Sequence, residues 1–277
     1  MLAPIRLQEY GVGVFGAVPT KSALKKALKK KWIRVNGVVA SSATFIHGGE
    51  RISLSRPPAA IPKKKLIFPL TVLFEDEHLA VIYKPAGILV SGNKFKTIAN
   101  ALMQNLQESS LPDATTPQPV HRLDYATTGV LLVGKTSSSI RVLNKLFENK
   151  TIKKTYYAVT IGDMGQQGEI TAAIDGKESQ SNYTVCESVC SKRFTKLNLV
   201  KLAPQTGRRH QLRKHLASIG HPILGDQEYG VEGLILNGKG LYLHAYSLSF
   251  KHPFSSEEVL FKADLPQKFS KIFHQPS

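Results

Sequence analysis

The sequence is poor in cysteine and in long hydrophobic runs, and each shortage excludes a class of protein. Two cysteines, Cys186 and Cys190, are too few for the disulfide framework of a secreted domain in a chain of 277 residues. Their spacing lacks two further ligands nearby, so we expect ordinary thiols on or near a strand rather than a zinc site. No run approaches the roughly 20 apolar residues that a membrane-spanning helix needs.

A recognisable targeting segment is also missing. Residues 10–20 are uncharged and rich in glycine, but no basic segment precedes them, as a secretory signal peptide would require. Together with the low cysteine content, this predicts a cytoplasmic protein in a reducing compartment.

Acidic residues are scarce relative to basic ones. The chain has 20 Asp and Glu against 37 Lys and Arg, which gives a formal net charge of +17. A charge of this size indicates nucleic acid or an anionic membrane surface as the partner. Residues 1–65 contain 13 Lys or Arg and 2 acidic residues, which accounts for +11 of the total. The uneven distribution predicts a separate basic module at the N-terminal end.

The basic end has the pattern of a small α+β domain. Residues 20–31 have apolar residues at helical spacing among lysines, and Thr20 or Ser22 can cap the helix. Residues 33–39 predict a strand, an Asn-Gly turn and a second strand. Residues 48–54 predict a turn that leads into a last strand.

The helix, the Val-Asn-Gly turn and the Gly-Gly-Glu-x-Ile segment together resemble the S-four-type RNA-binding domain over residues 17–57. Lys31 departs from that family, which usually has a glycine at the end of the helix, and Glu50 replaces the usual Asp. The alternative is a solvated helix and hairpin without a ligand. Crowded lysines cost stability, however, and phosphate contacts would explain them. The expected RNA contacts are Lys25, Lys26, Lys29, Lys30 and Arg34.

The pattern predicts two domains joined by a linker. Residues 1–60 form the basic domain, residues 61–69 a linker rich in proline and lysine, and residues 70–277 a large domain. Alternating short strands and helices in the large domain predict an α/β (α+β) fold with a mixed, mainly antiparallel sheet. Strands are expected near residues 72–74, 79–82, 130–133, 155–162, 181–187, 194–202, 241–250 and 258–263, and helices near residues 97–106, 137–147 and 208–218.

The most informative segment is His-Arg-Leu-Asp-Tyr-Ala-Thr-Thr-Gly-Val at residues 121–130. One carboxylate, Asp124, lies between a cation and a turn marked by glycine, and the apolar run that follows predicts a buried strand. We therefore expect Asp124 on a loop at the mouth of a rigid sheet, where a reactive group is exposed yet held still. The alternative is an Asp that caps a turn, with Arg122 as its surface partner.

Three further segments surround this one. Lys-Pro-Ala-Gly at residues 84–87 ends a strand with a rigid turn. Residues 154–162 predict a strand on which Tyr156 faces away from the core. The helix at residues 208–218, for which Thr206 can serve as cap, places Arg213 beside its apolar stripe. A partly buried arginine there needs a carboxylate partner.

In this order, over about residues 70–265, these segments resemble the RluA-type RNA pseudouridine synthases. The resemblance implies a pseudouridine synthase catalytic domain with Asp124 as the nucleophile, Tyr156 as the active-site tyrosine and Arg213 as the partner of Asp124. The implied reaction detaches uracil from its ribose, rotates it and rejoins it through carbon five. It implies no cofactor and no metal ion, which agrees with the lack of a Gly-rich phosphate loop or metal-ligand cluster in the sequence.

The implied partner is RNA rather than a membrane. Arg122 would fill the gap left by a flipped uridine, and Arg208 and Arg209 would bind phosphate. The histidines of the following helix, His210 and His215, are expected to be structural. Ribosomal RNA is the favoured substrate, transfer RNA is a second possibility, and a monomer is expected. Two rivals remain, a non-catalytic RNA-binding or ribosome-assembly protein on the same scaffold, and an RNA glycosidase.

Overall fold

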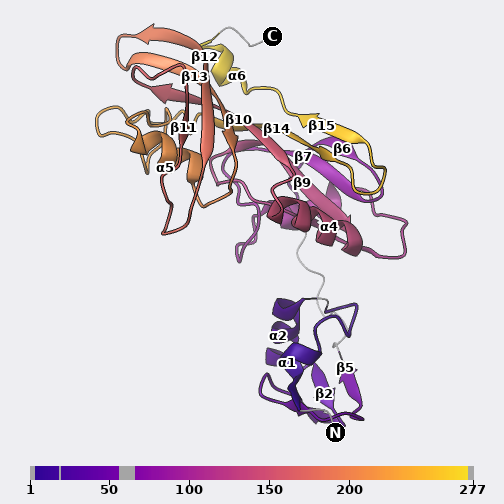
Figure 1. The fold of residues 1–277 in the computed structure, drawn as a ribbon. Helices are drawn as coiled ribbons and strands as arrows, with labels where there is room; N and C mark the ends of the chain where they lie inside the picture. The colour runs from indigo at the N-terminus through magenta and orange to yellow at the C-terminus, as the bar shows by residue number, and fades with distance from the viewer. Residues whose placement is uncertain (1–3, 19, 56–65, 274–277) are drawn as a thin grey trace. The chain divides into compact units, whose positions relative to one another are not determined.

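The computed structural model describes residues 4–18, 20–55 and 66–273 and divides into two compact units (Figure 1). The first unit spans residues 1–64 and the second residues 65–277. Most of the proline- and lysine-rich linker, as far as Lys65, lies outside the described residues.

The small unit contains the helix, hairpin and last strand expected from its pattern. The Thr20 side chain accepts a hydrogen bond from the Ala23 amide at 3.1 Å, so Thr20 rather than Ser22 caps the helix. Asn36 and Gly37 form the turn with φ angles of 48° and 82°. The described elements are β1 (Ile5–Arg6), α1 (Leu7–Tyr10), α2 (Lys21–Lys29), β2 (Ile33–Val35), β3 (Val38–Val39), β4 (Phe45–Ile46) and β5 (Ile52–Leu54).

A compact apolar core holds the small unit together. The buried face of α2, formed by Leu24, Ala27 and Leu28, packs in one cluster with Leu7 and Ile33. Every lysine of α2 is exposed on the other side. Burial on one face and charge on the other is the arrangement that the helical spacing predicts.

The large unit is built on a ten-stranded sheet in the order β11-β12-β13-β10-β14-β9-β7-β6, with β15 beside β14 and β8 beside β9. Its strand pairs are antiparallel in the described residues, except that β9 and β14 pair in parallel. The expected mixed, mainly antiparallel sheet is confirmed. The strands are β6 (Thr71–Glu75), β7 (Leu79–Lys84), β8 (Ala114–Pro119), β9 (Thr128–Thr136), β10 (Lys153–Ile161), β11 (Gln167–Ile170), β12 (Ser181–Ser191), β13 (Thr195–Pro204), β14 (Leu243–Lys251) and β15 (Glu258–Lys262).

Thr97 caps the helix expected near residues 97–106, because its hydroxyl accepts from the Asn100 amide at 3.3 Å. Thr136 caps the helix expected near residues 137–147, because its hydroxyl accepts from the Ser139 amide. Thr206 does not cap the helix expected at residue 208, which begins only at Gln211. The helices are α3 (Ile98–Ala101), η1 (Leu102–Gln104, a 3-10 helix), α4 (Ser137–Glu148), α5 (Gln211–Ser218) and α6 (Gln267–Ser270).

The parallel pair of β9 and β14 lies in the middle of the sheet (Figure 1). Gly129 lies inside β9, not in a turn as its place in the sequence suggested. It pairs with Ala245 at a φ of 118°, and a Cβ at this position would collide with the Ala245 carbonyl. Glycine therefore lets the two strands approach closely, directly after the loop that carries Asp124.

The residue after the C-cap of α2 adopts a backbone conformation that favours glycine. Lys31 follows α2 at a φ of 58°. Its amide donates to the Leu28 carbonyl at 2.9 Å, and the Trp32 amide donates to the Ala27 carbonyl at 3.0 Å. These bonds close the helix with a left-handed residue, a position that glycine usually occupies.

Lys31→Gly is therefore expected to stabilise the small unit by about 1 kcal/mol, because glycine adopts the left-handed conformation without the penalty of a side chain. Trp32 is the only tryptophan of the sequence, so its fluorescence during urea unfolding reports on this unit. Lys29→Gly, inside α2, is the matched control and is expected to destabilise by roughly 0.5–1 kcal/mol. A loss of stability in Lys31→Gly would contradict the interpretation.

Candidate active site

A cavity of about 670 Å³ opens in the large unit and contains the three residues predicted to be catalytic. Asp124 comes from the loop before β9, Tyr156 from β10 and Arg213 from α5. Three of the residues predicted to bind RNA, Arg122, Arg208 and Arg209, also line the cavity. The other predicted RNA contacts, Lys25, Lys26, Lys29, Lys30 and Arg34, are exposed on the small unit.

A buried lysine holds the loop that carries Asp124 through hydrogen bonds to its backbone. Lys84 is 0% exposed, and its ammonium donates to the carbonyl oxygens of Pro85, Tyr125 and Thr127 at 3.0, 3.2 and 2.9 Å. Burial lowers the pKa of Lys84 to about 8, while the charge of Asp124 acts in the opposite direction. The Lys-Pro-Ala-Gly segment is thus more than a rigid turn, since its lysine fixes the backbone that directly follows Asp124.

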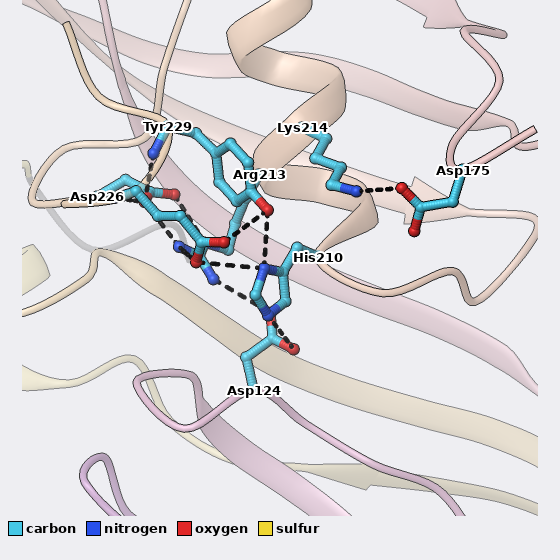
Figure 2. Close-up of polar contacts among 8 residues, drawn as sticks. Asp124, Asp175, His210, Arg213, Lys214, Asp226 and Tyr229 are labelled. Atoms are coloured by element: carbon cyan, nitrogen blue, oxygen red, sulfur yellow. Dashed lines mark hydrogen bonds and ion pairs between the residues drawn. The ribbon is translucent and has the colours of Figure 1, made fainter.

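Asp124 begins a turn but does not cap it. The Thr127 amide donates to the Asp124 backbone carbonyl at 3.1 Å. Within the described residues, the carboxylate accepts no hydrogen bond from that turn and forms no ion pair with Arg122. The nitrogen atoms nearest to it are instead Arg213 Nη1 at 3.8 Å and His210 Nε2 at 3.7 Å (Figure 2). The carboxylate oxygens therefore face the cavity next to two nitrogen groups.

The principal partner of Arg213 is Asp226, and Asp124 is its more distant one. Arg213 Nε and Nη2 donate to the two oxygens of Asp226, each at 2.7 Å, and Nη2 also donates to Glu228 at 3.2 Å. Asp226 is only 2% exposed. The expectation that a carboxylate satisfies Arg213 holds, but most of the pairing is with a residue to which the sequence had assigned no role.

Mutual pairing keeps both buried groups charged. Burial by itself would raise the pKa of Asp226, but the hydrogen bonds and the charge of Arg213 outweigh it and hold the pKa below its usual value. Burial likewise opposes the charged form of Arg213, while Asp226 and then Asp124 raise its pKa. The guanidinium is a permanent cation in a fixed orientation, with Nη1 directed at Asp124 (Figure 2).

A tight turn places Asp226 under the helix. Gly225 has a φ of 78°, and a Cβ there would collide with the Gly240 carbonyl oxygen, so the turn requires glycine. The Asp226 carboxylate also accepts from the amides of Glu228 and Tyr229 at 3.0 and 3.1 Å. The Gly-Asp-x-x-Tyr pattern, 13 residues after Arg213, is the signal from which this site could have been suspected.

His210 belongs to the site, whereas His215 is structural as expected. His210 adopts a left-handed conformation with a φ of 55° at the start of α5, and its Nδ1 lies 3.0 Å from the Tyr229 hydroxyl. Its other ring nitrogen faces Asp124 (Figure 2). His215 is buried and bonded to Ser179 and Ser181. A strained backbone at the lining of a cavity is typical of functional sites.

Tyr156 lies in the cavity, half-buried between two parts of the core. The expectation that its face of β10 lies away from the core is wrong, because Ala158 and Thr160 on the same face are fully buried. Burial raises the pKa of Tyr156 well above its usual value, and the negative charge of Asp124 raises it further. The phenol is therefore protonated at neutral pH.

The described residues contain neither a metal-binding cluster nor a membrane-spanning helix. No three His, Cys, Asp or Glu side chains within the described ranges are grouped as a metal ion would require. Among the same residues, no helix is long and apolar enough to cross a membrane. Cys186 and Cys190 are exposed free thiols on β12, as expected.

A comparison with known protein families matches the segment that contains Asp124, Tyr156 and Arg213. Residues 78–218 match a family described as RNA pseudouridylate synthase. The chain is 33% identical, over 92% of its length and 88% of the relative, to an uncharacterized RNA pseudouridine synthase of Aquifex aeolicus. It is 32% identical, over 91% of its length and 79% of the relative, to ribosomal large subunit pseudouridine synthase D of Nitrosomonas europaea. The solved structure of human RNA Pseudouridylate Synthase Domain Containing 4 matches with a TM-score of 0.57 and 26% identity, over 72% of this chain and 90% of that one.

The buried ion pair makes a prediction for stability. Asp226→Asn is expected to lower the free energy of unfolding by about 3 kcal/mol, because Arg213 keeps its charge but loses its buried partner. Glu228→Gln is the matched control, since the Glu228 side chain is 50% exposed, and should cost less than about 1 kcal/mol. Urea unfolding followed by circular dichroism measures both, and equal effects would contradict the prediction.

The same pair predicts a dependence on pH. The pKa of Asp226 is lower in the folded chain than its usual value, so its contribution to stability is present above about pH 4 and is lost as the pH falls through the folded pKa. The difference in stability between the wild type and Asp226→Asn should therefore shrink below about pH 4. A constant difference across this range would contradict the assignment.

Proposed function

Since the chain belongs to the RNA pseudouridine synthase family, we propose that Asp124 is the nucleophile with which it converts uridine to pseudouridine in ribosomal RNA. In this isomerisation the bond between N1 of uracil and C1′ of ribose breaks, and a bond between C5 and C1′ forms. C5 loses a proton and N1 gains one, so no oxidant or reductant is needed.

The observation that carries the proposal is the position of the Asp124 carboxylate. It lines the cavity, accepts no hydrogen bond from the described residues, and lies 3.8 Å from a guanidinium that is held by a second carboxylate. A nucleophilic carboxylate must be ionised, oriented and open to substrate. The Arg213 cation stabilises its negative charge, and Lys84 fixes its backbone.

Tyr156 is proposed to stack on the uracil ring rather than to accept a proton. A tyrosine accepts a proton only as a phenolate, and burial together with the charge of Asp124 raises the pKa of Tyr156. The protonated ring still offers a flat apolar surface inside the cavity. Stacking on an aromatic side chain is a common way to hold an extruded base.

The target uridine must leave its helix to reach Asp124, at a cost of a few kcal/mol. Arg122 lines the same cavity, is exposed, and lies two residues before Asp124. We propose that its side chain occupies the gap that the flipped base leaves behind. Arg208 and Arg209, also exposed on the cavity rim, are proposed to contact the backbone of the same RNA.

Ribosomal RNA is the proposed substrate because the Nitrosomonas relative is named for the large ribosomal subunit. The small unit is proposed to bind the same RNA, since its exposed lysines on α2 form a basic face opposite the core. We further propose that the enzyme acts as a monomer in the cytoplasm. Transfer RNA is the alternative substrate, and the experiment below includes both pools.

Asp124→Asn is expected to abolish turnover, because an amide cannot serve as the nucleophile, while RNA binding stays within about twofold. The assay uses ribosomal and transfer RNA, labelled with tritium at C5 of uridine, from cells that lack this protein. Formation of the C5–C1′ bond releases the C5 proton, so tritium in water counts turnovers.

Asp175→Asn is the matched control, because Asp175 is an exposed carboxylate paired with Lys214 outside the cavity. Its tritium release should equal that of the wild type. Release from wild type with RNA from one pool identifies the substrate class. Tritium release by Asp124→Asn would contradict the assignment of the nucleophile, and RNA binding without release by the wild type would favour a non-catalytic RNA-binding protein.

A further inference from the structure

Two lysines that line the cavity have no role in the chemistry described above. Lys154 precedes Tyr156 by two residues on β10, and Lys150 follows the end of α4. The Lys154 side chain is half-buried, and its ammonium donates to the Thr206 carbonyl at 3.4 Å. Within the described residues, neither lysine forms an ion pair with a carboxylate.

In having no acidic partner among the described residues, Lys150 and Lys154 differ from three other lysines of the large unit. Lys135, Lys196 and Lys214 each form an ion pair with a carboxylate, at distances between 2.6 and 2.8 Å. Glu148 also lines the cavity, but it is exposed and bonds to neither Lys150 nor Lys154 in the described residues. A half-buried ammonium without a counter-ion is costly, so the position favours an anion supplied from outside.

The electrostatics around Lys154 agree with this interpretation. Burial lowers the pKa of Lys154, and the charge of Lys150 lowers it further. His121, beside them in the cavity lining, adds no charge, since burial lowers its pKa to about 3. Its Nε2 accepts from the Leu132 amide at 3.0 Å and its ring stacks on Phe147, so it forms a rigid neutral support. An anion near Lys154 would thus be close to two ammonium groups and one neutral imidazole.

We infer that Lys154 and Lys150 bind a backbone phosphate of the RNA nucleotide whose base stacks on Tyr156. Two residues along a strand span about 6.6 Å, a distance comparable with that from a base to its own or the adjacent phosphate. This inference rests on the proposed function, because it requires the uracil beside Tyr156. Lys154 is a positioning residue, since it holds the RNA backbone and does not touch the reacting atoms.

Lys154→Met tests the inference against Lys153→Met. Lys153 is the neighbouring lysine on β10, but it is exposed and does not line the cavity. Both variants lose one positive charge, so general attraction of RNA changes equally. In the tritium-release assay, Lys154→Met should raise KM about tenfold with kcat within twofold of wild type, because the contact is present throughout the reaction. Lys153→Met should change neither by more than twofold.

A binding measurement tests the phosphate contact independently of turnover. In the Asp124→Asn background, filter binding of the same RNA at several salt concentrations gives the slope of log affinity against log salt. Loss of one phosphate contact should reduce that slope by about 0.7 to 0.9 in Lys154→Met. Lys154→Arg should retain the slope, and thermal unfolding midpoints verify that all variants are folded.

Equal slopes and equal KM values for Lys154→Met and Lys153→Met would overturn the inference. A slope change confined to Lys154→Met, in a protein whose wild type releases no tritium from either RNA pool, would overturn the proposed function but support the phosphate site. A fall in kcat without a change in KM or slope would also overturn the inference, since it would indicate a role in the chemical step.

Discussion

The buried, bidentate ion pair between Arg213 and Asp226 is the interaction on which the active site depends. It joins α5 to the turn after Gly225, and it leaves one guanidinium nitrogen directed at Asp124. A guanidinium tied only to Asp124 would be free to rotate toward solvent. Because Asp226 holds two of its nitrogens, the third has a fixed direction, and the proposed nucleophile Asp124 meets a cation that is already in place.

A second constraint brings Asp124 to that cation. The parallel pair of β9 and β14 requires the close approach that Gly129 permits, and β7 delivers Lys84 beneath the same loop. Strand pairing and buried hydrogen bonds thus hold the backbone around Asp124, while its carboxylate stays unbonded in the cavity. The scaffold is the rigid part of the site, and in the proposed mechanism the unbonded carboxylate keeps its lone pairs for substrate.

Much of this could be predicted from the sequence, and the exceptions have physical causes. The Asp124 loop, the strand after it and the capped α2 follow from short-range patterns. The pairing of Arg213 with Asp226 could not be predicted, because the periodicity of a helix indicates that a residue is buried but not which distant turn meets it. The prediction that Tyr156 faces away from the core failed for a similar reason. Alternation along a strand predicts one solvent-facing side, but both faces of β10 are covered by other parts of the protein. The left-handed backbone of Lys31 belongs to the local bonds that close α2, whereas that of His210 accompanies a contact with the distant Tyr229.

The measurement that tests the central claim most directly is a map of pseudouridines in ribosomal and transfer RNA, by carbodiimide modification and primer extension. The cells compared contain the wild-type gene, no gene, or the gene for Asp124→Asn. The account predicts that defined pseudouridines disappear without the gene, return with the wild type and stay absent with Asp124→Asn. Their return with Asp124→Asn, or no loss in either RNA pool, would contradict it.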